Sequence, residues 1–342
     1  MRTSGVLAMA GIGLAATGWA ASPASAQSVL DRVRTRGYVT CGASQGVPGL
    51  SRPDEKGVWR GFDSDVCRIL AVAVLGDRDK IRFTPLNAAQ RLPSIQTGEI
   101  DVLSRTTTWT YTRDAAVRFV ATTFYDTDAF IVGANSGVKA VKDLNGLTVC
   151  LQGGGSLTEN TLLEVEEDEG IQTKKVYFDS TIQARDAYFA GRCDSYITDG
   201  SAAAGQRATV ARNPADHVLI PAGHHTEPNG VVIPRGDDRW FDIARWSINV
   251  LIWAEDRGIT QANVDAKLAS GGKEVKRVLG AEPGFGKPLG LDDKWAYNII
   301  KQVGNYGEIW ERNVGQGSPL KLDRGLNALY RHGGLYFPLP WD

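Results

Sequence analysis

The sequence predicts an α/β fold of two lobes, each built on a mainly parallel sheet with helices on its faces. Short β-branched segments alternate with helical periods along residues 38–197, and this alternation requires crossover connections between parallel strands. A chain of 342 residues also exceeds what a single hydrophobic core usually holds. Two extended segments, 124–132 and 231–233, lie about a hundred residues apart, as a chain requires if it leaves one lobe, builds a second and returns.

The individual elements follow from the spacing of apolar residues. Residues 38–41 are typical of a strand, residues 63–75 of a helix with one apolar face, and residues 81–84 of the next strand. The pattern predicts further helices over 89–96, 156–165, 181–190 and 240–255, and further strands over 100–104, 146–151, 176–178 and 195–197. We therefore expect a first lobe over 27–130 and 229–285, an inserted second lobe over 131–228, and a C-terminal extension over 286–342 that packs on the first lobe.

The first 26 residues are typical of a cleavable signal peptide. Arg2 is followed by an apolar run over 6–19, which is too short to cross a bilayer core of about 30 Å. The run leads to Ala24-Ser25-Ala26, a small-residue ending of the kind that signal peptidase cleaves. We expect an exported protein that begins at Gln27, with an uncleaved membrane anchor as the alternative.

Export affects the interpretation of the four cysteines. Cys41, Cys67, Cys150 and Cys193 are too widely spaced for a zinc site, and an oxidising compartment favours two disulfides. Of the three possible connectivities we favour Cys41 with Cys67 and Cys150 with Cys193, because each pair then joins a strand to a nearby element of the same lobe. Buried free thiols are the alternative.

Composition limits the partners of the chain. The 38 Lys and Arg residues against 39 Asp and Glu residues give a formal net charge of -1, so no overall field attracts nucleic acid or an anionic membrane. The glycine cluster at 153–155 lacks the lysine and the spacing of a phosphate-binding loop, which argues against a nucleotide. We expect a monomer that takes a small ligand and uses no metal or cofactor.

Three segments carry groups suited to a zwitterionic ligand. Residues 104–114 place many hydroxyls before Arg113, whose planar guanidinium suits a carboxylate. Gly155 and Ser156 stand at the expected start of a helix, where unpaired N–H groups attract anions. Asp199 ends a strand and offers an acid to an ammonium group. The alternative for the first segment is a threonine-rich surface turn in which Arg113 pairs with Asp114 or with solvent.

In their order and spacing these segments resemble the solute-binding proteins of polar amino-acid ABC transporters, in particular the general L-amino-acid-binding group. The similar stretches are 101–105 running on to 112–114, 149–152 before the glycines, and 191–194 before Thr198 and Asp199. Further support comes from 61–67, from Glu227 and Pro228, and from 235–243. The resemblance covers nearly the whole mature chain.

The resemblance implies a two-lobed periplasmic-binding-protein fold of type II, joined by a two-strand hinge, which closes on a free L-amino acid and delivers it to a membrane permease. It also implies roles for individual residues. Arg113 would bind the α-carboxylate, with help from Thr108 and from groups at Arg105 and Thr106. Ser156, beside Gly155, would reach that carboxylate from the second lobe, Asp199 would bind the α-ammonium, and Gln45 would line the wall of the pocket. The chain departs from the family pattern at 154–156, where Gly-Gly-Ser stands in place of Gly-Thr-Thr and one hydroxyl is lost.

Two other functions remain as alternatives. A sensor that presents its ligand to a chemoreceptor has the same site and differs only in its docking surface. An enzyme of the dehydratase type on the same fold requires a nucleophile or a base, but Ser156 lacks the GxSxG turn and the cysteines have expected partners. The adjacent His224 and His225 cannot both face one metal in an extended segment, so we expect a loop near the hinge there and no catalytic residues.

Overall fold

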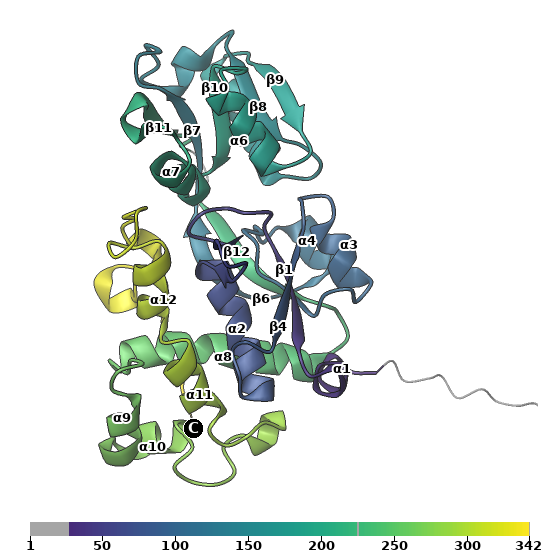
Figure 1. Cartoon of the computed structure of the whole chain (residues 1–342), viewed down its shortest axis with the longest axis vertical. Coiled ribbons are helices and arrows are strands. Elements are labelled where there is room, and N and C mark those ends of the chain that lie inside the picture. The colour runs from purple at the N-terminus through teal and green to yellow at the C-terminus, as the bar shows by residue number, and fades with distance from the viewer. Residues whose placement is uncertain (1–26, 224–225, 342) are drawn as a thin grey trace, which may run out of the picture.

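The computed structural model describes residues 27–223 and 226–341. It contains two five-stranded sheets, which lie one above the other in Figure 1. The expected signal peptide and His224 and His225 lie outside the described residues. The first sheet has the order β4-β1-β5-β12-β6 and the second the order β11-β7-β10-β8-β9. The strands of the first sheet are β1 (Val39–Ala43), β4 (Ile81–Pro85), β5 (Val102–Leu103), β6 (Arg118–Asp126) and β12 (Glu227–Ile233). Those of the second are β7 (Asp128–Gly133), β8 (Thr148–Gln152), β9 (Lys174–Phe178), β10 (Ser195–Asp199) and β11 (His217–Pro221).

Each sheet has a parallel part and an antiparallel part. The pairs β1 with β4, β1 with β5, β8 with β9 and β8 with β10 are parallel. The antiparallel pairs all involve β6, β7, β11 or β12, the strands that carry the chain between the lobes. The crossover units thus form the parallel part, as the alternating sequence pattern requires. The hinge strands change lobe at Thr127, between β6 and β7, and between Pro221 and Glu227, where β11 ends and β12 begins.

The helices of each lobe cover its sheet. In the first lobe they are α1 (Val29–Arg36), α2 (Phe62–Leu75), α3 (Arg91–Gln96), α4 (Tyr111–Ala116) and α8 (Asp238–Asp256). In the second they are α5 (Leu157–Glu169), α6 (Thr181–Phe189) and α7 (Gly200–Thr209). Helix α2 begins with acids in its first turn and ends at Gly76, whose φ of 70° is a left-handed conformation that glycine adopts without strain. A small hairpin of β2 (Arg52–Pro53) and β3 (Trp59–Arg60) precedes α2.

Each lobe has hydrophobic clusters of its own. In the first lobe, the fully buried Trp240 and Trp253 of α8 lie in one apolar cluster with side chains of α2. In the second lobe, Leu162 and Val165 of α5 lie in one apolar cluster, and Ala184 and Tyr188 of α6 lie in another with Ala203 of α7. Separate cores allow the two lobes to move as units about the connecting strands.

The structure forms both of the disulfides that we favour. Cys41 pairs with Cys67 at a Cα–Cα distance of 6.2 Å, which joins β1 to α2. Cys150 pairs with Cys193 at 5.7 Å, which joins β8 to the turn before β10. Each bond therefore stays within one lobe, and neither restricts the hinge.

The C-terminal segment packs against the first lobe. It contains α11 (Trp295–Gln302) and α12 (Tyr306–Asn313), and α9 (Val264–Ser270) and α10 (Lys273–Val278) precede it. Helices α11 and α12 contact α2 and α8, and they lie below and beside the first sheet in Figure 1. Short 3-10 turns occupy Val141–Leu144, Pro214–Asp216, Lys287–Leu289, Gly325–Asn327 and Tyr330–His332.

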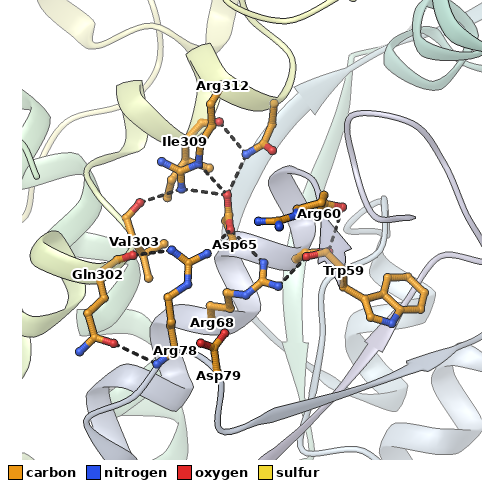
Figure 2. A network of polar contacts seen from close by, with 12 residues as sticks. Trp59, Arg60, Asp65, Arg68, Arg78, Asp79, Gln302, Val303, Ile309 and Arg312 are labelled. Atoms are coloured by element: carbon orange, nitrogen blue, oxygen red, sulfur yellow. Dashed lines mark hydrogen bonds and ion pairs between the residues drawn. The ribbon is translucent and has the colours of Figure 1, made fainter. Parts of the chain in front are cut away.

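A buried carboxylate fastens this segment to α2 (Figure 2). One oxygen of Asp65 lies 3.0 Å from Arg68 and 3.7 Å from Arg78. The other accepts hydrogen bonds of 2.9 Å from Arg312 Nε and from Asn313 Nδ2, both on α12. Asp65 thus interacts with three arginines and links α12 to α2. Because Asp65 is only 4% exposed, water screens these interactions little.

Candidate functional site

A small polar cavity of about 30 Å³ lies where the two lobes meet. The first lobe contributes Ser44, Val47, Ala88, Arg91, Arg105, Thr106, Thr108 and Glu227. The second lobe contributes Gln152, Ser156, Leu157, Thr158, Thr181, Tyr196, Ile197, Thr198 and Asp199. The lobes also approach each other beside the cavity: a Cβ on Gly205 of α7 would lie 2.7 Å from the carbonyl oxygen of Pro48. A glycine at this position therefore permits the closed arrangement.

The loop after β5 is held by a buried acid. Asp63, in the first turn of α2, accepts a hydrogen bond of 2.9 Å from Ser104 Oγ, and burial raises the pKa of its carboxyl to about 6. Arg105 follows and donates from Nε to the carbonyl oxygen of Leu86 at 2.8 Å. Thr106 has a φ of 34°, a left-handed conformation that is strained for a side chain branched at Cβ. Such strain often marks residues that a binding site holds in place.

Arg113 reaches across the junction of the lobes. Its Nη1 donates to the carbonyl oxygen of Thr108 at 3.0 Å, and its Nη2 donates to that of Gly155, in the second lobe, at 2.9 Å. Burial lowers the pKa of this guanidinium, whereas the charges of Glu227 and Asp199 act in the opposite direction. Arg113 is thus close enough to interact electrostatically with both acids, although it lies beside the cavity and does not line it.

The glycine turn positions the start of α5 at the cavity. Gly154 and Gly155 have φ values of 74° and 90°, which explains the choice of glycine. Ser156 is the N-cap residue of α5, yet its side chain caps no backbone N–H. The hydroxyl therefore remains available to a ligand beside the partial positive charge of the helix N-terminus. We expected backbone donors from this turn, and Gly155 in addition offers its carbonyl oxygen to Arg113.

Asp199 lies at the opposite side of the cavity, at the end of β10 and the beginning of α7. Its carboxylate caps no backbone N–H of α7. Burial and the neighbouring Asp126 and Asp128 raise its pKa to about 8. One oxygen each of Asp199, Asp128 and Glu227 lie within 4.8 Å of one another. A positive group at this point would relieve the repulsion between the acids.

The other predicted residues are distributed as follows. Arg105, Thr106, Thr108, Ser156 and Asp199 line the cavity. Gln45 lies outside that lining, although Ser44 and Val47 of the same loop belong to it.

Sequence reasoning missed three buried charges at the site. Arg91 begins α3, is 4% exposed, and lines the cavity with an Nε that has no partner within the described chain. Asp128 begins β7 and Glu227 begins β12, and they are 1% and 3% exposed. A signal existed for Asp128, because the otherwise apolar stretch 124–132 contains two acids, Asp126 and Asp128, and a buried acid must find a partner. Glu227 contributed to the family resemblance, but nothing in the sequence indicated its role.

The buried acids make stability depend on pH. Burial and the charges of Asp128, Asp199 and Asp126 raise the pKa of Glu227 to about 10, from 4.5. The folded chain therefore keeps a proton that the unfolded chain loses, and stability falls as pH rises above 4.5. We expect Glu227→Gln to gain stability relative to the wild type between pH 5 and pH 8, by at least about 1 kcal/mol, since one pKa unit corresponds to about 1.4 kcal/mol.

Urea unfolding of ligand-free protein at several pH values measures this difference. Glu55→Gln, the same change on an exposed side chain, is the control. A constant difference between Glu227→Gln and the wild type over this pH range would show that Glu227 is ionised in the folded state throughout.

Comparison with known proteins identifies close relatives. The sequence profile of a family described as bacterial extracellular solute-binding proteins, family 3, matches residues 39–315. The chain is 46% identical over 338 residues to the general L-amino acid-binding periplasmic protein AapJ of Rhizobium johnstonii, with 98% of each chain covered. It is 41% identical over 321 residues to the glutamate/glutamine/aspartate/asparagine-binding protein BztA of Rhodobacter capsulatus, covering 93% of this chain and 94% of that protein.

Solved structures agree with the two-lobed architecture. A periplasmic binding protein of an ABC transporter from Brucella ovis, with glutathione bound, superposes with a TM-score of 0.88 at 43% identity, covering 92% of this chain and 99% of the other. Among the described residues, none of the helices is long and apolar enough to span a bilayer.

Proposed function

Because the chain belongs to the bacterial extracellular solute-binding proteins of family 3, we propose that it is the substrate-binding component of an ABC importer for free L-α-amino acids. One observation carries this proposal. The guanidinium groups of Arg91 and Arg105 in the first lobe and the carboxylate of Asp199 in the second lobe line one polar cavity, and Arg113 stands beside it. A zwitterion requires such a pair of opposite charges, since an unpaired buried charge costs several kcal/mol.

The resemblance and the geometry together suggest a role for each group. Arg113 binds the α-carboxylate, helped by the Thr108 hydroxyl and by groups at Arg105 and Thr106. Ser156 and the turn at Gly155 reach the carboxylate from the second lobe, and Asp199 accepts the α-ammonium. Gln45 remains a candidate for the outer wall. A ligand held from both lobes binds the closed form more tightly than the open form, and this difference in affinity drives closure.

Arg91 indicates which ligand side chains are favoured. Its buried, partly unpaired guanidinium suits a side-chain carboxylate or amide, in keeping with the relative named for glutamate, glutamine, aspartate and asparagine. We expect Arg91→Met to weaken glutamate binding by about 1.5 to 3 kcal/mol, the usual value of a hydrogen bond to a charged group. Alanine, which has no such side chain, should lose much less. Calorimetry with both ligands measures the difference, and equal losses would show that Arg91 does not contact the side chain.

A thermal-shift screen of the twenty common amino acids tests the function itself. The protein is first unfolded and refolded to remove any ligand acquired in the cell. A ligand present at a thousandfold excess over its Kd stabilises the folded state by about 4 kcal/mol. A raised melting temperature with one or more L-amino acids supports the proposal, and no shift with any of the twenty would contradict it.

Cellular location and partners follow from the same function. We propose that residues 1–26 are removed on export, that the mature chain works in the periplasm as a monomer, and that its partner is the membrane permease of the importer. The relatives named as periplasmic proteins support this location. N-terminal sequencing of protein from the periplasmic fraction tests the cleavage, and a first residue other than Gln27 would revise the site.

We also infer that the chain delivers its ligand without altering it, since the relatives are named as binding proteins. Chromatography of the ligand recovered after denaturation tests this inference. A chemically changed amino acid would favour the dehydratase alternative.

A further inference from the structure

The chain continues beyond residue 315, where the match to the family profile ends. We call residues 316–336 the C-terminal strap. In Figure 1 the strap is the yellow chain that follows α12 and lies below α7. One part of it is attached to the first lobe, and another part touches α7 of the second lobe. The strap therefore spans the junction at which the lobes close.

The strap is anchored on the last part of β6. Asn327 accepts a hydrogen bond of 2.7 Å from the backbone N–H of Tyr125 and donates one of 2.8 Å to the carbonyl oxygen of the same residue. Because β6 is an edge strand of the first sheet, Asn327 takes the place of a neighbouring strand. Arg324 donates to the carbonyl oxygen of Asn327 and pairs with Glu255 of α8 at 2.9 and 3.1 Å. The anchor thus lies next to the hinge at Thr127.

Leu320 is the part of the strap that meets the second lobe. A Cβ added to Gly205 of α7 would lie 3.3 Å from Leu320 Cδ2, and one added to Gly49 of the first lobe would lie 2.6 Å from the same atom. The end of this side chain therefore lies between the lobes, against a position of α7 that has no side chain. Ala202, on the same face of α7, belongs to the apolar cluster of the first lobe against which Leu320 also packs.

The backbone fixes the direction of Leu320. Its N–H donates to Ser318 Oγ at 3.2 Å. Lys321 follows with a φ of 50°, a left-handed conformation, and Thr106 at the cavity is the other non-glycine residue of the described chain with a positive φ. Such strain persists where the surrounding structure holds a residue in place, as it does at ligand clamps and switch regions.

We propose that the strap is a closure device that stabilises the closed form from outside the cavity, because Leu320 loses its contact with α7 when the lobes separate. The proposal rests on the amino-acid-binding function. Ligand and strap then favour the same closed form, so the strap raises the affinity for every ligand by the same factor and touches none of them. It sets the strength of binding and leaves the choice of ligand to the cavity.

Leu320→Ala tests the proposal, with Leu322→Ala as the matched control, since Leu322 belongs to the same strap and packs on the cluster of the first lobe. Calorimetry should show a Kd about three- to tenfold higher in Leu320→Ala than in Leu322→Ala, because part of the apolar area that Leu320 buries lies on the second lobe. Stopped-flow measurements should assign the loss to faster dissociation, since the contact exists only after closure. Both side chains are partly buried, so thermal melting first checks that the two variants are equally folded.

Two ligands from the thermal-shift screen distinguish the outcomes. Equal factors of weakening for both support the strap, whereas clearly different factors would show that Leu320 acts on the cavity and would overturn the proposal. Binding in Leu320→Ala within twofold of Leu322→Ala would also overturn it. If the wild type binds no amino acid, the proposed function has failed and the strap proposal fails with it.

Gly205→Ala approaches the same contact from the second lobe. Alanine favours the helical conformation of α7, but its methyl group would lie 2.7 Å from the carbonyl oxygen of Pro48 and 3.3 Å from Leu320 Cδ2 in the closed form. We expect amino-acid binding to weaken by about tenfold or more, because an overpacked contact hinders closure. Affinity within twofold of the wild type would show that the lobes close without this approach, and the strap would have no seat on α7.

Discussion

Replacing Arg113 with alanine is expected to weaken amino-acid binding by about 2 to 5 kcal/mol, the usual cost of breaking a buried charge pair. The guanidinium belongs to the first lobe and already contacts the second through the carbonyl oxygen of Gly155. Its loss removes the group that we propose as the partner of the α-carboxylate, together with a contact between the lobes. Asp199→Ala should lose a similar amount, because it removes the acid that we propose as the partner of the α-ammonium. Calorimetry on ligand-free protein measures both, with Arg82→Ala on the edge strand β4 as a control outside the cavity.

Ligand analogues show which end each residue binds. An amine that lacks the α-carboxylate should bind poorly to the wild type, and Arg113→Ala should discriminate far less between this amine and the parent amino acid. A hydroxy acid that lacks the α-ammonium should give the corresponding result with Asp199→Ala. This cycle isolates the pairwise interaction from general damage to the cleft. Unchanged affinity in either variant would remove that residue from the site.

Much of the fold could be predicted because its signals are local. The one-sided apolar spacing of 63–75 predicted α2, which spans Phe62–Leu75, and the β-branched run at 81–84 predicted β4. Helix α7 escaped prediction, because its run of Gly, Ser and Ala residues has no apolar period and gains its stability by packing on the second sheet. The stretch 124–132 appeared continuous, whereas the chain changes lobe within it at Thr127.

The residues of the site likewise fall into those that local sequence could predict and those that it could not. Residues of the loop after β5 and of the turn before α5 could be proposed because each stands in a segment of distinctive composition. Arg91, Asp128 and Glu227 lie far apart along the chain. The fold brings Arg91 and Glu227 to the cavity and places Asp128 next to Glu227. Their burial is a tertiary property, and a single sequence contains no direct signal for it. For Gln45 the difficulty is one of position within a segment. The sequence indicated its loop, but Ser44 and Val47 of that loop line the cavity, and Gln45 does not.

Asp65→Ala is expected to destabilise the first lobe by about 3 to 5 kcal/mol, the range for leaving a buried charge without its partner. The substitution would leave Arg68 buried, with a side chain only 4% exposed, next to Arg78 and Arg312 (Figure 2). Desolvation already lowers the pKa of Arg68, and Asp65 is the foremost of the charges that oppose this shift. Urea unfolding measures the loss, and Glu55→Ala on an exposed side chain is the control.

A rescue experiment separates electrostatics from packing in this network. Asp65→Leu combined with Arg68→Met replaces the pair by apolar side chains and should recover much of the lost stability, because the desolvation cost of both charges disappears. Arg312→Ala should cost less than Asp65→Ala, since its own side chain is 34% exposed and Arg68 keeps its partner. In Arg312→Ala, α12 has lost a contact with α2 and should become more accessible to protease, while the rest of the lobe remains folded. If Asp65→Ala and Arg312→Ala cost the same, the acid stabilises the C-terminal helix alone and the buried Arg68 needs no partner.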